Sequence, residues 1–567
     1  MKIVDYLELC EPNELIEFLG KQLAELMIEF LPTSQPIYTS ENLARMLFSL
    51  YGLKILDDAS IRERLIRCFS MEDLHSFESI LGVENMNLEA SELIQKINQT
   101  PWKKNKVSKR ILEILDIKED IFEKNEATRD TVEVINSEST FYELLDYQFV
   151  IKQQILFQIN NNENELTKVL VCMPTGTGKT KTAMHTLIHQ FIFNMEKRGL
   201  IIWVAHTKEL LEQAYDTFKN VWAHLGDGEV TAYKSWGDFN LPYQDSYNGF
   251  IFCGIQKLQA IYKKEKMFET LKRNCSILVI DEAHRAGAPQ TKLVVDEIMQ
   301  RPKGFNDRSL IGLTATPGRG DSVENKKYIS MFENNKLDIN LDLLNRLNLD
   351  MVQALNIQQD ESIITYFQRR SILAKLIREE LCYNGLTKEE ISRLKIDLKS
   401  NGYKDYTDEF LSTVGRNKSR NQKIMSRLIE LNEAQIPTIV FACSVEHGKL
   451  LSAALTLRGI SNGHVFGDMN ANERDLIIKR YKDKDDELNI LINFEVLTTG
   501  FDAKNTKCVF ITRPTKSTVL YSQMIGRGLR GPKMGGNSEC LLVDIKDNLD
   551  KYSGEAEAFE SFHKYWN

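Results

Sequence analysis

Apolar residues in the first part of the chain recur at spacings of three and four. This period is clearest in residues 14–31 and 40–53, where it predicts amphipathic helices. The second of these helices would begin at Ser40 or Glu41, because such polar residues favour a helix start. We therefore expect a helical domain over residues 1–130.

From about residue 140 the pattern changes to short apolar runs that alternate with helical segments. Runs of about four to seven residues that are apolar on both faces are typical of strands in a buried parallel sheet. A charged segment with a helical pattern divides them into two series. The first comprises residues 168–173, 199–206, 249–254, 275–281 and 309–316, and the second comprises residues 438–443, 488–494, 508–514 and 539–545.

These patterns predict an α/β fold with two parallel-sheet domains in tandem, behind a helical N-terminal domain and joined by a helical connector. The expected boundaries are 1–130 for the N-terminal helical accessory domain, 131–325 for the first αβ domain, 326–430 for the helical connector and 431–567 for the second αβ domain.

Composition narrows the class of protein. The 567 residues are 42% hydrophobic and 27% charged, which excludes a disordered or collagen-like chain. Seventy-two basic and 80 acidic residues give a net charge of -8, which argues against coating nucleic acid by bulk charge but allows a local basic groove. The start has no signal-peptide pattern, no apolar run approaches about 18 residues, and the nine cysteines are scattered. We expect a soluble, cytoplasmic protein with reduced thiols and no membrane contact.

The strongest local signal is the run MPTGTGKT at residues 173–180, between a predicted strand and a helical pattern. A glycine-rich turn at a helix N-terminus lets backbone N–H groups surround a phosphate. Lys179 would reach the β- and γ-phosphates of a nucleotide, and the Thr180 hydroxyl would ligate Mg²⁺. Met173 stands where the first glycine of the general pattern usually lies. The cradle would be formed by Thr175, Gly176, Thr177 and Gly178.

A second signal is the run DEAH at residues 281–284, at the end of a predicted strand. A carboxylate at the carboxyl end of a parallel strand lies at the ligand-binding edge of the sheet. Asp281 would hold Mg²⁺, and Glu282 would orient and deprotonate an attacking water molecule. The alternative is a pair of acidic residues that caps a helix.

A third signal is the run QMIGRGLR at residues 523–530 in the second αβ domain. A phosphoryl group in transfer needs cationic stabilisation, which arginines from another domain can supply. Arg527 and Arg530 are three residues apart, so we expect them to share a helix face, with Gln523 nearby. The alternative is a pair of surface arginines in ordinary ion pairs.

In this order along the chain, these runs resemble the motifs of superfamily 2 DEAD/DEAH-box helicases and translocases. The resemblance extends over about residues 145–532 and implies two RecA-like domains with ATP and Mg²⁺ in the cleft between them. Gln148, just upstream of the glycine-rich run, is similar to the glutamine that reads adenine in that family. Residues 313–317 resemble motif III, which implies that Thr314 and Thr316, together with His284, couple the ATP and nucleic-acid sites.

Other runs resemble the family's nucleic-acid motifs. These are residues 204–213 for motif Ia, 254–258 for motif Ib, 439–451 for motif IV and 497–505 for motif V. The residues implied at the nucleic acid are Thr207, Lys208, Gln256, Thr498 and Thr499. Gly500 and Asp502 of motif V are implied nearer the nucleotide.

The DEAH and QxxGRGxR runs resemble the DNA-directed group around RadD, UvrB and the motor subunits of restriction enzymes. The short separation of Asp502 and Gln523 leaves little room for a long strand-separating hairpin, which favours translocation over processive unwinding. The leading hypothesis is an ATP-dependent DNA translocase or helicase in bacterial repair or anti-phage defence. One alternative is an ATP-gated nucleic-acid sensor or assembly switch that recruits a partner such as a nuclease. Another is an RNA-directed helicase.

No nuclease pattern stands out in residues 1–130, so a nuclease would be a separate protein. The N-terminal helices could steer DNA, bind such a partner or inhibit the motor. Three basic runs, at residues 101–110, 369–381 and 415–423, could touch phosphates, but solvated helix surface is the favoured interpretation.

Overall fold

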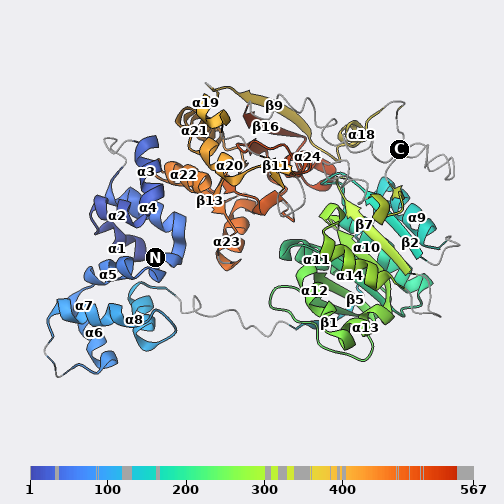
Figure 1. Cartoon of the computed structure of the whole chain (residues 1–567), viewed down its shortest axis with the longest axis horizontal. Helices are drawn as coiled ribbons and strands as arrows, with labels where there is room; N and C mark the ends of the chain where they lie inside the picture. Colours follow the sequence, from blue (N-terminus) through green and yellow to red (C-terminus); the bar gives the residue numbers. More distant parts are fainter. Residues whose placement is uncertain are drawn as a thin grey trace. The chain divides into compact units, whose positions relative to one another are not determined.

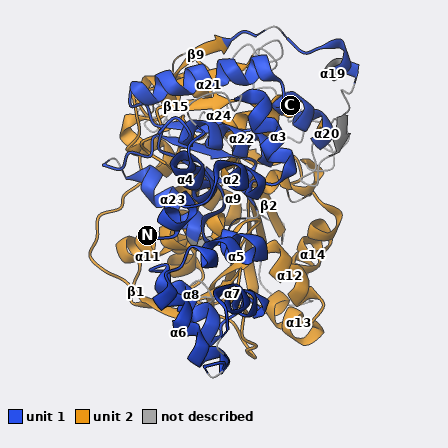
Figure 2. Ribbon diagram, turned by 90° about the vertical axis from the view of Figure 1, so that its left-hand side faces the viewer, with its two compact units in different colours: residues 1–128, 381–393, 408–496 blue, residues 129–380, 394–407, 497–567 orange. Residues whose placement is uncertain are grey.

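The computed structural model divides the chain into two compact units (Figure 2). The first holds residues 1–128, 381–393 and 408–496, and the second holds residues 129–380, 394–407 and 497–567. The structure describes residues 2–31, 38–84, 86, 88–117, 130–160, 166–285, 287–300, 308–316, 329–337, 355, 358, 361–383, 385–392, 396–398, 404–467, 469, 471–483, 485–498, 500–501 and 503–545. Within these residues, no helix is both long and apolar enough to span a membrane.

The N-terminal part of the first unit is helical (Figure 1). Its helices are α1 (Lys2–Glu8), α2 (Pro12–Phe18), α3 (Lys21–Phe30), α4 (Ser40–Tyr51), α5 (Ala59–Arg67), α6 (Met71–Leu81), α7 (Ala90–Gln99) and α8 (Lys106–Ile114), with a 3₁₀ turn η1 (Gly52–Asp57) after α4. The prediction of one helix over residues 14–31 is wrong, because Gly20, with φ 79°, separates α2 from α3. Helix α4 begins at Ser40 as expected, and the Thr39 hydroxyl caps it by accepting from the Asn42 N–H at 3.2 Å.

The other elements of the first unit follow later in the chain. They are α19 (Lys388–Ser392), α20 (Asp408–Gly415), α21 (Lys418–Glu433), β12 (Thr438–Phe441), α22 (Val445–Thr456), β13 (Asn462–Val465), α23 (Ala471–Lys482) and β14 (Ile490–Asn493). Helices α3 and α4 pack against α22, and α3 also contacts α21. The Lys449 ammonium lies 5.2 Å from the centre of the Tyr51 ring. The N-terminal helices therefore share one compact unit with helices of the predicted second αβ domain.

The second unit contains an eight-stranded sheet in the order β1-β4-β5-β3-β6-β7-β2-β8. Its strands are β1 (Val132–Asn136), β2 (Leu166–Cys172), β3 (Leu200–Ala205), β4 (Glu229–Ser235), β5 (Gly249–Gly254), β6 (Cys275–Asp281), β7 (Arg308–Thr314) and β8 (Lys336–Leu337). All neighbouring pairs are parallel except β1 with β4. Every residue of β3, β5 and β7 is buried, as the continuous apolar runs predicted.

Helices connect these strands and complete the layers. They are α9 (Asp146–Asn160), α10 (Lys179–His189), α11 (Lys208–Leu225), α12 (Ile255–Tyr262), α13 (Glu265–Asn274) and α14 (Pro289–Met299), with a π-helical turn η3 (Gln190–Asn194) and a 3₁₀ turn η4 (Ala283–Arg285). Helices α9 to α11 pack in succession, and α12 to α14 form a second packed group. This strand–helix alternation in parallel sheets confirms the predicted α/β class.

A second sheet has six strands in the order β13-β14-β12-β15-β16-β9. Its remaining strands are β15 (Cys508–Ile511), β16 (Glu539–Ile545) and β9 (Lys375–Leu381), and nearby elements are α18 (Ile363–Arg369), η5 (Val496–Thr498), α24 (Thr518–Ile525) and η6 (Pro532–Met534). The connector is therefore helical only in part. Residues 369–381, expected as helix surface, form the end of α18 and then β9, because KLIREEL alternates more and less exposed positions as an edge strand does. The connector also contains a short hairpin of β10 (Ile396–Leu398) and β11 (Lys404–Tyr406).

The other two basic runs lie on helices. Residues 101–110 lead into α8, and Lys103 before this helix and Lys106 and Lys109 on it are exposed, as a solvated surface requires. Residues 415–423 lead into α21, and here the expectation holds only in part. Arg420 is 0% exposed and donates to the Cys443 sulfur at 3.6 Å, because this face of α21 packs on the rest of the unit.

The packing of α22 gives a test of the first unit. A Cβ added at Gly448 would lie 2.6 Å from the Phe466 ring, and that ring is stacked on His464 at 4.9 Å. Overpacking costs about 1–3 kcal/mol, which exceeds the ~1 kcal/mol that alanine gains over glycine in a helix. We expect Gly448→Ala to lower the midpoint of urea unfolding. A rise, as helix propensity alone would give, would contradict this packing.

Candidate functional site

The glycine-rich run lies between β2 and α10, at the carboxyl edge of the eight-stranded sheet. Gly176 and Gly178 have φ of 87° and 82°, a left-handed conformation that side-chain-bearing residues rarely adopt. Thr177 is fully buried, and its hydroxyl donates to the Pro174 carbonyl at 2.7 Å. Helix α10 begins at Lys179. The predicted cradle residues therefore form a tight loop that leads directly into the N-terminus of α10. This is the arrangement of a phosphate-binding loop.

Helix α9 supports this loop from outside. The Tyr147 hydroxyl donates to the Thr177 carbonyl at 2.6 Å, and the Gln148 amide donates to the same oxygen at 2.9 Å. The Gln148 carbonyl oxygen accepts from the Leu145 N–H at 3.0 Å, and the Gln148 side chain is buried. Both ends of this amide therefore bind protein groups, and its expected contact with adenine stays a prediction.

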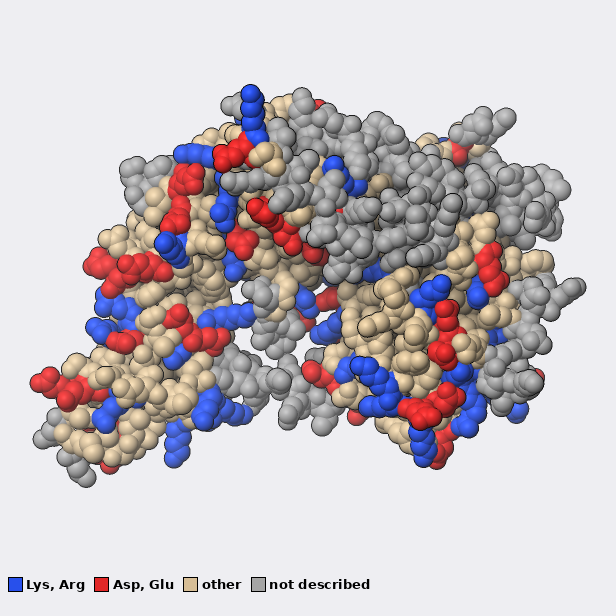
Figure 3. Space-filling view, in the orientation of Figure 1, with Lys and Arg blue, Asp and Glu red and all other residues tan. Residues whose placement is uncertain are grey.

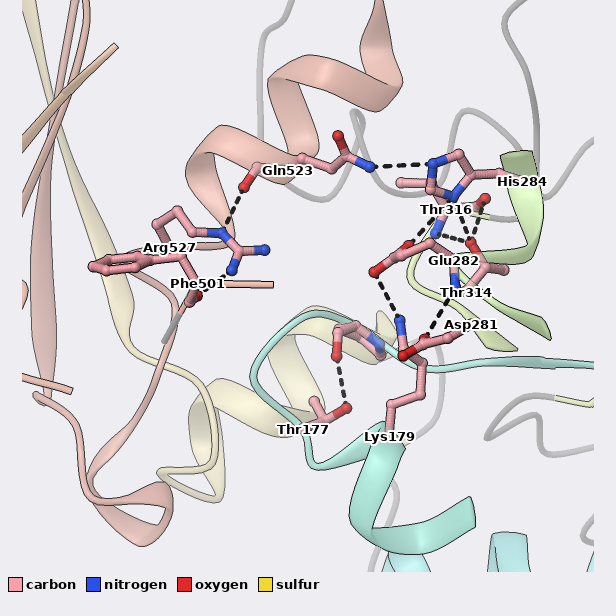
Figure 4. A network of polar contacts seen from close by, with 11 residues as sticks. Thr177, Lys179, Asp281, Glu282, His284, Thr314, Thr316, Phe501, Gln523 and Arg527 are labelled. Atoms are coloured by element: carbon pink, nitrogen blue, oxygen red, sulfur yellow. Dashed lines mark hydrogen bonds and ion pairs between the residues drawn. The ribbon is translucent and has the colours of Figure 1, made fainter. Parts of the chain in front are cut away.

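The sheet order brings the loop and the DEAH run together. Strands β6, β7 and β2 are neighbours, with Asp281 opposite Leu313 and Thr314 opposite Cys172. Lys179 forms an ion pair with Glu282 at 3.3 Å, and the two side chains are only 11% and 13% exposed (Figure 4). Glu282 has φ 50°, a strained conformation for a residue with a side chain, which often marks a functional site.

The two adjacent carboxylates have opposite electrostatic environments. Burial, together with the Glu282 charge, raises the pKa of Asp281 to about 7 although the Lys179 charge opposes the shift. Burial also acts to raise the pKa of Glu282, but the Lys179 charge and the His284 hydrogen bond outweigh it and hold that pKa well below its usual range. Glu282 is therefore the ionised partner of Lys179, and Asp281 is a buried carboxyl that a cation would stabilise.

His284 connects three segments of the site. Its Nδ1 lies 3.3 Å from the Glu282 carboxylate and 3.3 Å from the Thr314 hydroxyl, and its Nε2 lies 3.2 Å from the Gln523 amide nitrogen (Figure 4). Burial lowers the pKa of His284, against the effect of Glu282. The ring is therefore neutral, and these partners assign the proton to Nδ1, so that Nε2 accepts from Gln523.

Thr314 and Thr316 close a compact turn after β7. The Thr314 hydroxyl donates to the Thr316 carbonyl at 2.9 Å and accepts from the Thr316 N–H at 3.1 Å. Both side chains are buried. Through its contact with His284, this turn lies beside the DEAH run, and its coupling role stays a prediction.

The arginines of the 523–530 run do not share a helix face, contrary to expectation. Helix α24 ends at Ile525, and the Arg527 guanidinium donates to the Gln523 carbonyl at 3.2 Å and to the Phe501 carbonyl. Arg530 pairs instead with Leu373 in an isolated antiparallel bridge.

Close packing on the phosphate-binding loop accounts for this path. A Cβ at Gly526 would lie 2.8 Å from the Thr175 Cβ, so only glycine fits where the helix ends. The Arg530 Cα lies 3.7 Å from the Cβ position of Gly176. The run therefore meets the loop through its backbone.

The predicted nucleic-acid residues of motifs Ia and Ib line one cavity of about 200 Å³. Thr207, Lys208 and Gln256 lie on its wall. The Thr207 hydroxyl caps α11 by accepting from the Leu210 N–H at 3.3 Å, and Gln256 lies in the first turn of α12. Two helix N-termini therefore meet at the cavity, where backbone N–H groups favour anions.

Sequence reasoning missed other residues of this cavity. Trp236, Gly237 and Lys257 also line it. The first two directly follow β4, a strand that was not predicted because its sequence EVTAYKS alternates polar and apolar residues. The alternating strand followed by a tryptophan–glycine pair was the sequence signal that could have indicated a strand ending in a turn here.

The motif V residues are only partly described. Thr498 is buried in η5, and a Cβ at Gly500 would lie 3.2 Å from the Leu210 nitrogen, at the start of α11. Thr499 and Asp502 lie outside the described residues. The structure therefore places Gly500 beside motif Ia, and its expected contact with the nucleotide stays a prediction.

Two family models match the chain. The model for the type III restriction enzyme res subunit matches residues 141–319, and the model for the helicase conserved C-terminal domain matches residues 420–531. The first range contains the phosphate-binding loop, the DEAH run and motif III, and the second contains the glycine–arginine run.

Individual proteins are similar over most of the chain. A candidate ATP-dependent helicase, IRC3, of Saccharomyces cerevisiae is 26% identical over 408 residues, 71% of this chain and 51% of the relative. The type I restriction enzyme EcoAI endonuclease subunit of Escherichia coli is 23% identical over 428 residues, 72% of this chain and 47% of that subunit. The chain thus spans about half the length of these relatives. Among solved structures, Saccharomyces cerevisiae Dbp5 bound to RNA and ADP BeF3 covers 74% of this chain and 87% of its own, with a TM-score of 0.45 and 15% identity.

The matches and the geometry agree on the same segments. The two models follow one another in the order expected from the motifs, and the structure joins Lys179, Glu282, His284 and Gln523 of these motifs in one series of contacts. The chain therefore belongs to the superfamily 2 helicases.

Proposed function

We propose that this chain is a nucleic-acid-dependent ATPase that translocates along DNA. One observation carries the proposal: a continuous chain of contacts runs from Lys179 through Glu282 and His284 to Gln523. It links the phosphate-binding loop to the DEAH run and then to the glycine–arginine run, so nucleotide chemistry at one end would alter contacts at the other.

The loop and the two carboxyl groups suit a magnesium nucleotide. The Thr180 hydroxyl and the Asp281 carboxylate are hard oxygen donors of the kind Mg²⁺ prefers, and burial leaves Asp281 in need of positive charge. When bound there, Mg²⁺ would neutralise charge on the β- and γ-phosphates. Lys179 and the N–H groups of residues 175–180 would bind and orient the phosphates.

Glu282 would act as the base toward the attacking water molecule. Its ion pair with Lys179 keeps it ionised but weakly basic before the nucleotide binds. A γ-phosphate would draw the Lys179 ammonium away, and the loss of this counter-charge would raise the pKa of Glu282 and make it a stronger base. Arg527 and Arg530 are the proposed cationic stabilisers of the transferring phosphoryl group.

The cavity of motifs Ia and Ib is the proposed contact with the nucleic-acid backbone. Helix N-termini and Lys208 can bind phosphates regardless of base sequence. Acidic and basic side chains are interspersed over the described part of the face in Figure 3, in keeping with local contacts rather than a broad basic surface. Thr498 and Thr499 of motif V are proposed to extend this contact.

DNA is the preferred track in this proposal, in bacterial repair or anti-phage defence. Relatives named as type I restriction endonuclease subunits occur in Escherichia coli and Methanocaldococcus jannaschii, and the latter is 23% identical over 445 residues. By the same comparison, a separate nuclease is a candidate partner of the N-terminal helices. RNA is the competing track, and an ATP-gated switch that binds without moving is the competing mechanism.

Substitutions in the Lys179–Glu282 pair test the ATPase. We expect Glu282→Gln to lower kcat for ATP hydrolysis by about 100-fold or more without lowering ATP affinity, because the base is lost while Lys179 stays available to the phosphates. Lys179→Ala should lower both kcat and ATP affinity, because the phosphates lose a ligand. Steady-state hydrolysis with single-stranded DNA, duplex DNA or RNA measures this and identifies the track.

Lys197→Ala is the matched control, since Lys197 pairs with Asp227 on the surface at 2.7 Å. Wild-type hydrolysis by Lys179→Ala would refute the assignment of the site.

The backbone contact predicts a salt-dependent effect at Lys208. We expect Lys208→Ala to weaken binding to all DNA sequences alike and to reduce the slope of log affinity against log salt by about 1. Fluorescence anisotropy at several salt concentrations measures both quantities. Lys219→Ala, on the same helix and also in an ion pair but not among the residues that line the cavity, should leave them unchanged. Equal effects of the two variants would contradict a specific role for the cavity.

A further inference from the structure

Residues 361–375, here called the brace, were expected only to connect the two αβ domains. They comprise α18, the turn at residues 370–372 and the residues that lead into β9, and they lie within the second unit. Tyr366, Phe367, Ile372 and Leu373 of the brace are each at most 1% exposed. A connector that merely crosses the surface would not bury such side chains, so the brace is a packed part of the site's surroundings.

One side of the brace holds the helix that supports the phosphate-binding loop. The Phe367 and Tyr147 rings are 4.9 Å apart in an edge-to-face arrangement. The Arg370 guanidinium pairs with the Asp146 carboxylate at 2.5 Å, at the first residue of α9. Because Tyr147 donates directly to the Thr177 carbonyl, these contacts lie one residue away from the loop itself.

The other side holds the end of the glycine–arginine run by backbone hydrogen bonds. The Ala374 N–H donates to the Leu529 carbonyl at 2.8 Å, the Gly531 N–H to the Ile372 carbonyl at 2.9 Å and the Lys533 N–H to the Ser371 carbonyl at 2.9 Å. Arg530 lies between these bonds, paired with Leu373. A Cβ at Gly531 would lie 2.6 Å from the Ser371 oxygen. A side chain at residue 531 would therefore push the two segments apart and break these backbone hydrogen bonds.

Leu373 also lies close to the loop. Its Cδ2 atom is 3.5 Å from the point where a Cβ would stand if residue 176 carried a side chain. Four consecutive residues, Arg370 to Leu373, therefore reach α9, the glycine–arginine run and the phosphate-binding loop. Backbone movement at any one of these places would shift the others, because packed contacts and hydrogen-bonded backbone transmit displacement.

We propose that the brace positions Arg530 relative to the phosphate-binding loop, with the Arg370–Asp146 ion pair as its anchor on α9. This inference rests on the proposed function and deepens it by assigning Arg370 as a positioning residue for ATP binding and hydrolysis. Arg370 acts through Asp146 and α9 on the loop, and through Leu373 on Arg530. The pair is partly exposed, so it contributes little to stability and its loss should be seen mainly in nucleotide binding and turnover.

The test compares Arg370→Ala, Arg370→Lys and Asp146→Asn in the full chain. We expect Arg370→Ala and Asp146→Asn each to lower kcat for DNA-stimulated ATP hydrolysis by about 10-fold and to weaken binding of a fluorescent ATP analogue several-fold. Arg370→Lys keeps the charge pair and should restore most of both. The double variant should be no worse than either single variant, because the two residues act as one contact.

Arg369→Ala is the matched control. Arg369 is the neighbouring arginine of α18, but it pairs with Glu361 of the brace itself at 2.8 Å. Its removal should leave turnover and affinity at wild-type values, and the melting temperatures of all variants should agree with that of the wild type. Wild-type turnover and affinity in Arg370→Ala, or additive losses in the double variant, would overturn the proposal.

The proposed function and the role of the brace can be refuted separately. A wild-type chain that hydrolyses no ATP with any nucleic acid would refute the proposed function. Affinity for the ATP analogue would then test the role of the brace by itself. Weaker binding by Arg370→Ala, with rescue by Arg370→Lys, would support that role. Equal affinities of the wild type and Arg370→Ala would refute it.

Discussion

The ion pair between Lys179 and Glu282 is the contact on which the rest of the site depends. Both side chains are nearly buried, where a single unpaired charge would be strongly unfavourable. Lys179 opens α10 and Glu282 follows β6, so the pair fixes the phosphate-binding loop, which follows β2, against the end of a strand that β7 separates from β2. His284 takes its orientation from Glu282, and Gln523 binds the far side of its ring. One salt link thus orders groups from three distant parts of the sequence.

In the proposed cycle, this pair is also the element that changes. A phosphate competes with Glu282 for the same ammonium group, so nucleotide binding would exchange one partner of Lys179 for another. Glu282 would then gain basicity when the substrate is in place, and its contact with His284 would respond to the new charge. The neutral His284 ring passes this change to Gln523, while the brace holds the backbone around Arg530 in register with the loop.

The sequence predicted features that are encoded locally. The phosphate-binding loop and the DEAH run follow buried parallel strands, whose continuous apolar composition is visible without any tertiary information. Strands β4 and β9 escaped prediction because half of their positions are polar, and only their neighbours in the sheet make them strands. The path of Arg530 was also beyond local reasoning. It depends on Gly526 fitting against Thr175 and on pairing with Leu373, contacts between residues far apart in the chain.

Displacement of a roadblock tests the central claim most directly, because it separates movement from binding and hydrolysis. Streptavidin bound to the biotinylated end of a DNA strand would be released by a motor that pulls itself along that strand. We expect ATP-dependent release by the wild-type chain, with none by Glu282→Gln and none with a non-hydrolysable ATP analogue. DNA-stimulated ATP hydrolysis without release, from either end of either strand, would contradict translocation and identify the chain as a switch.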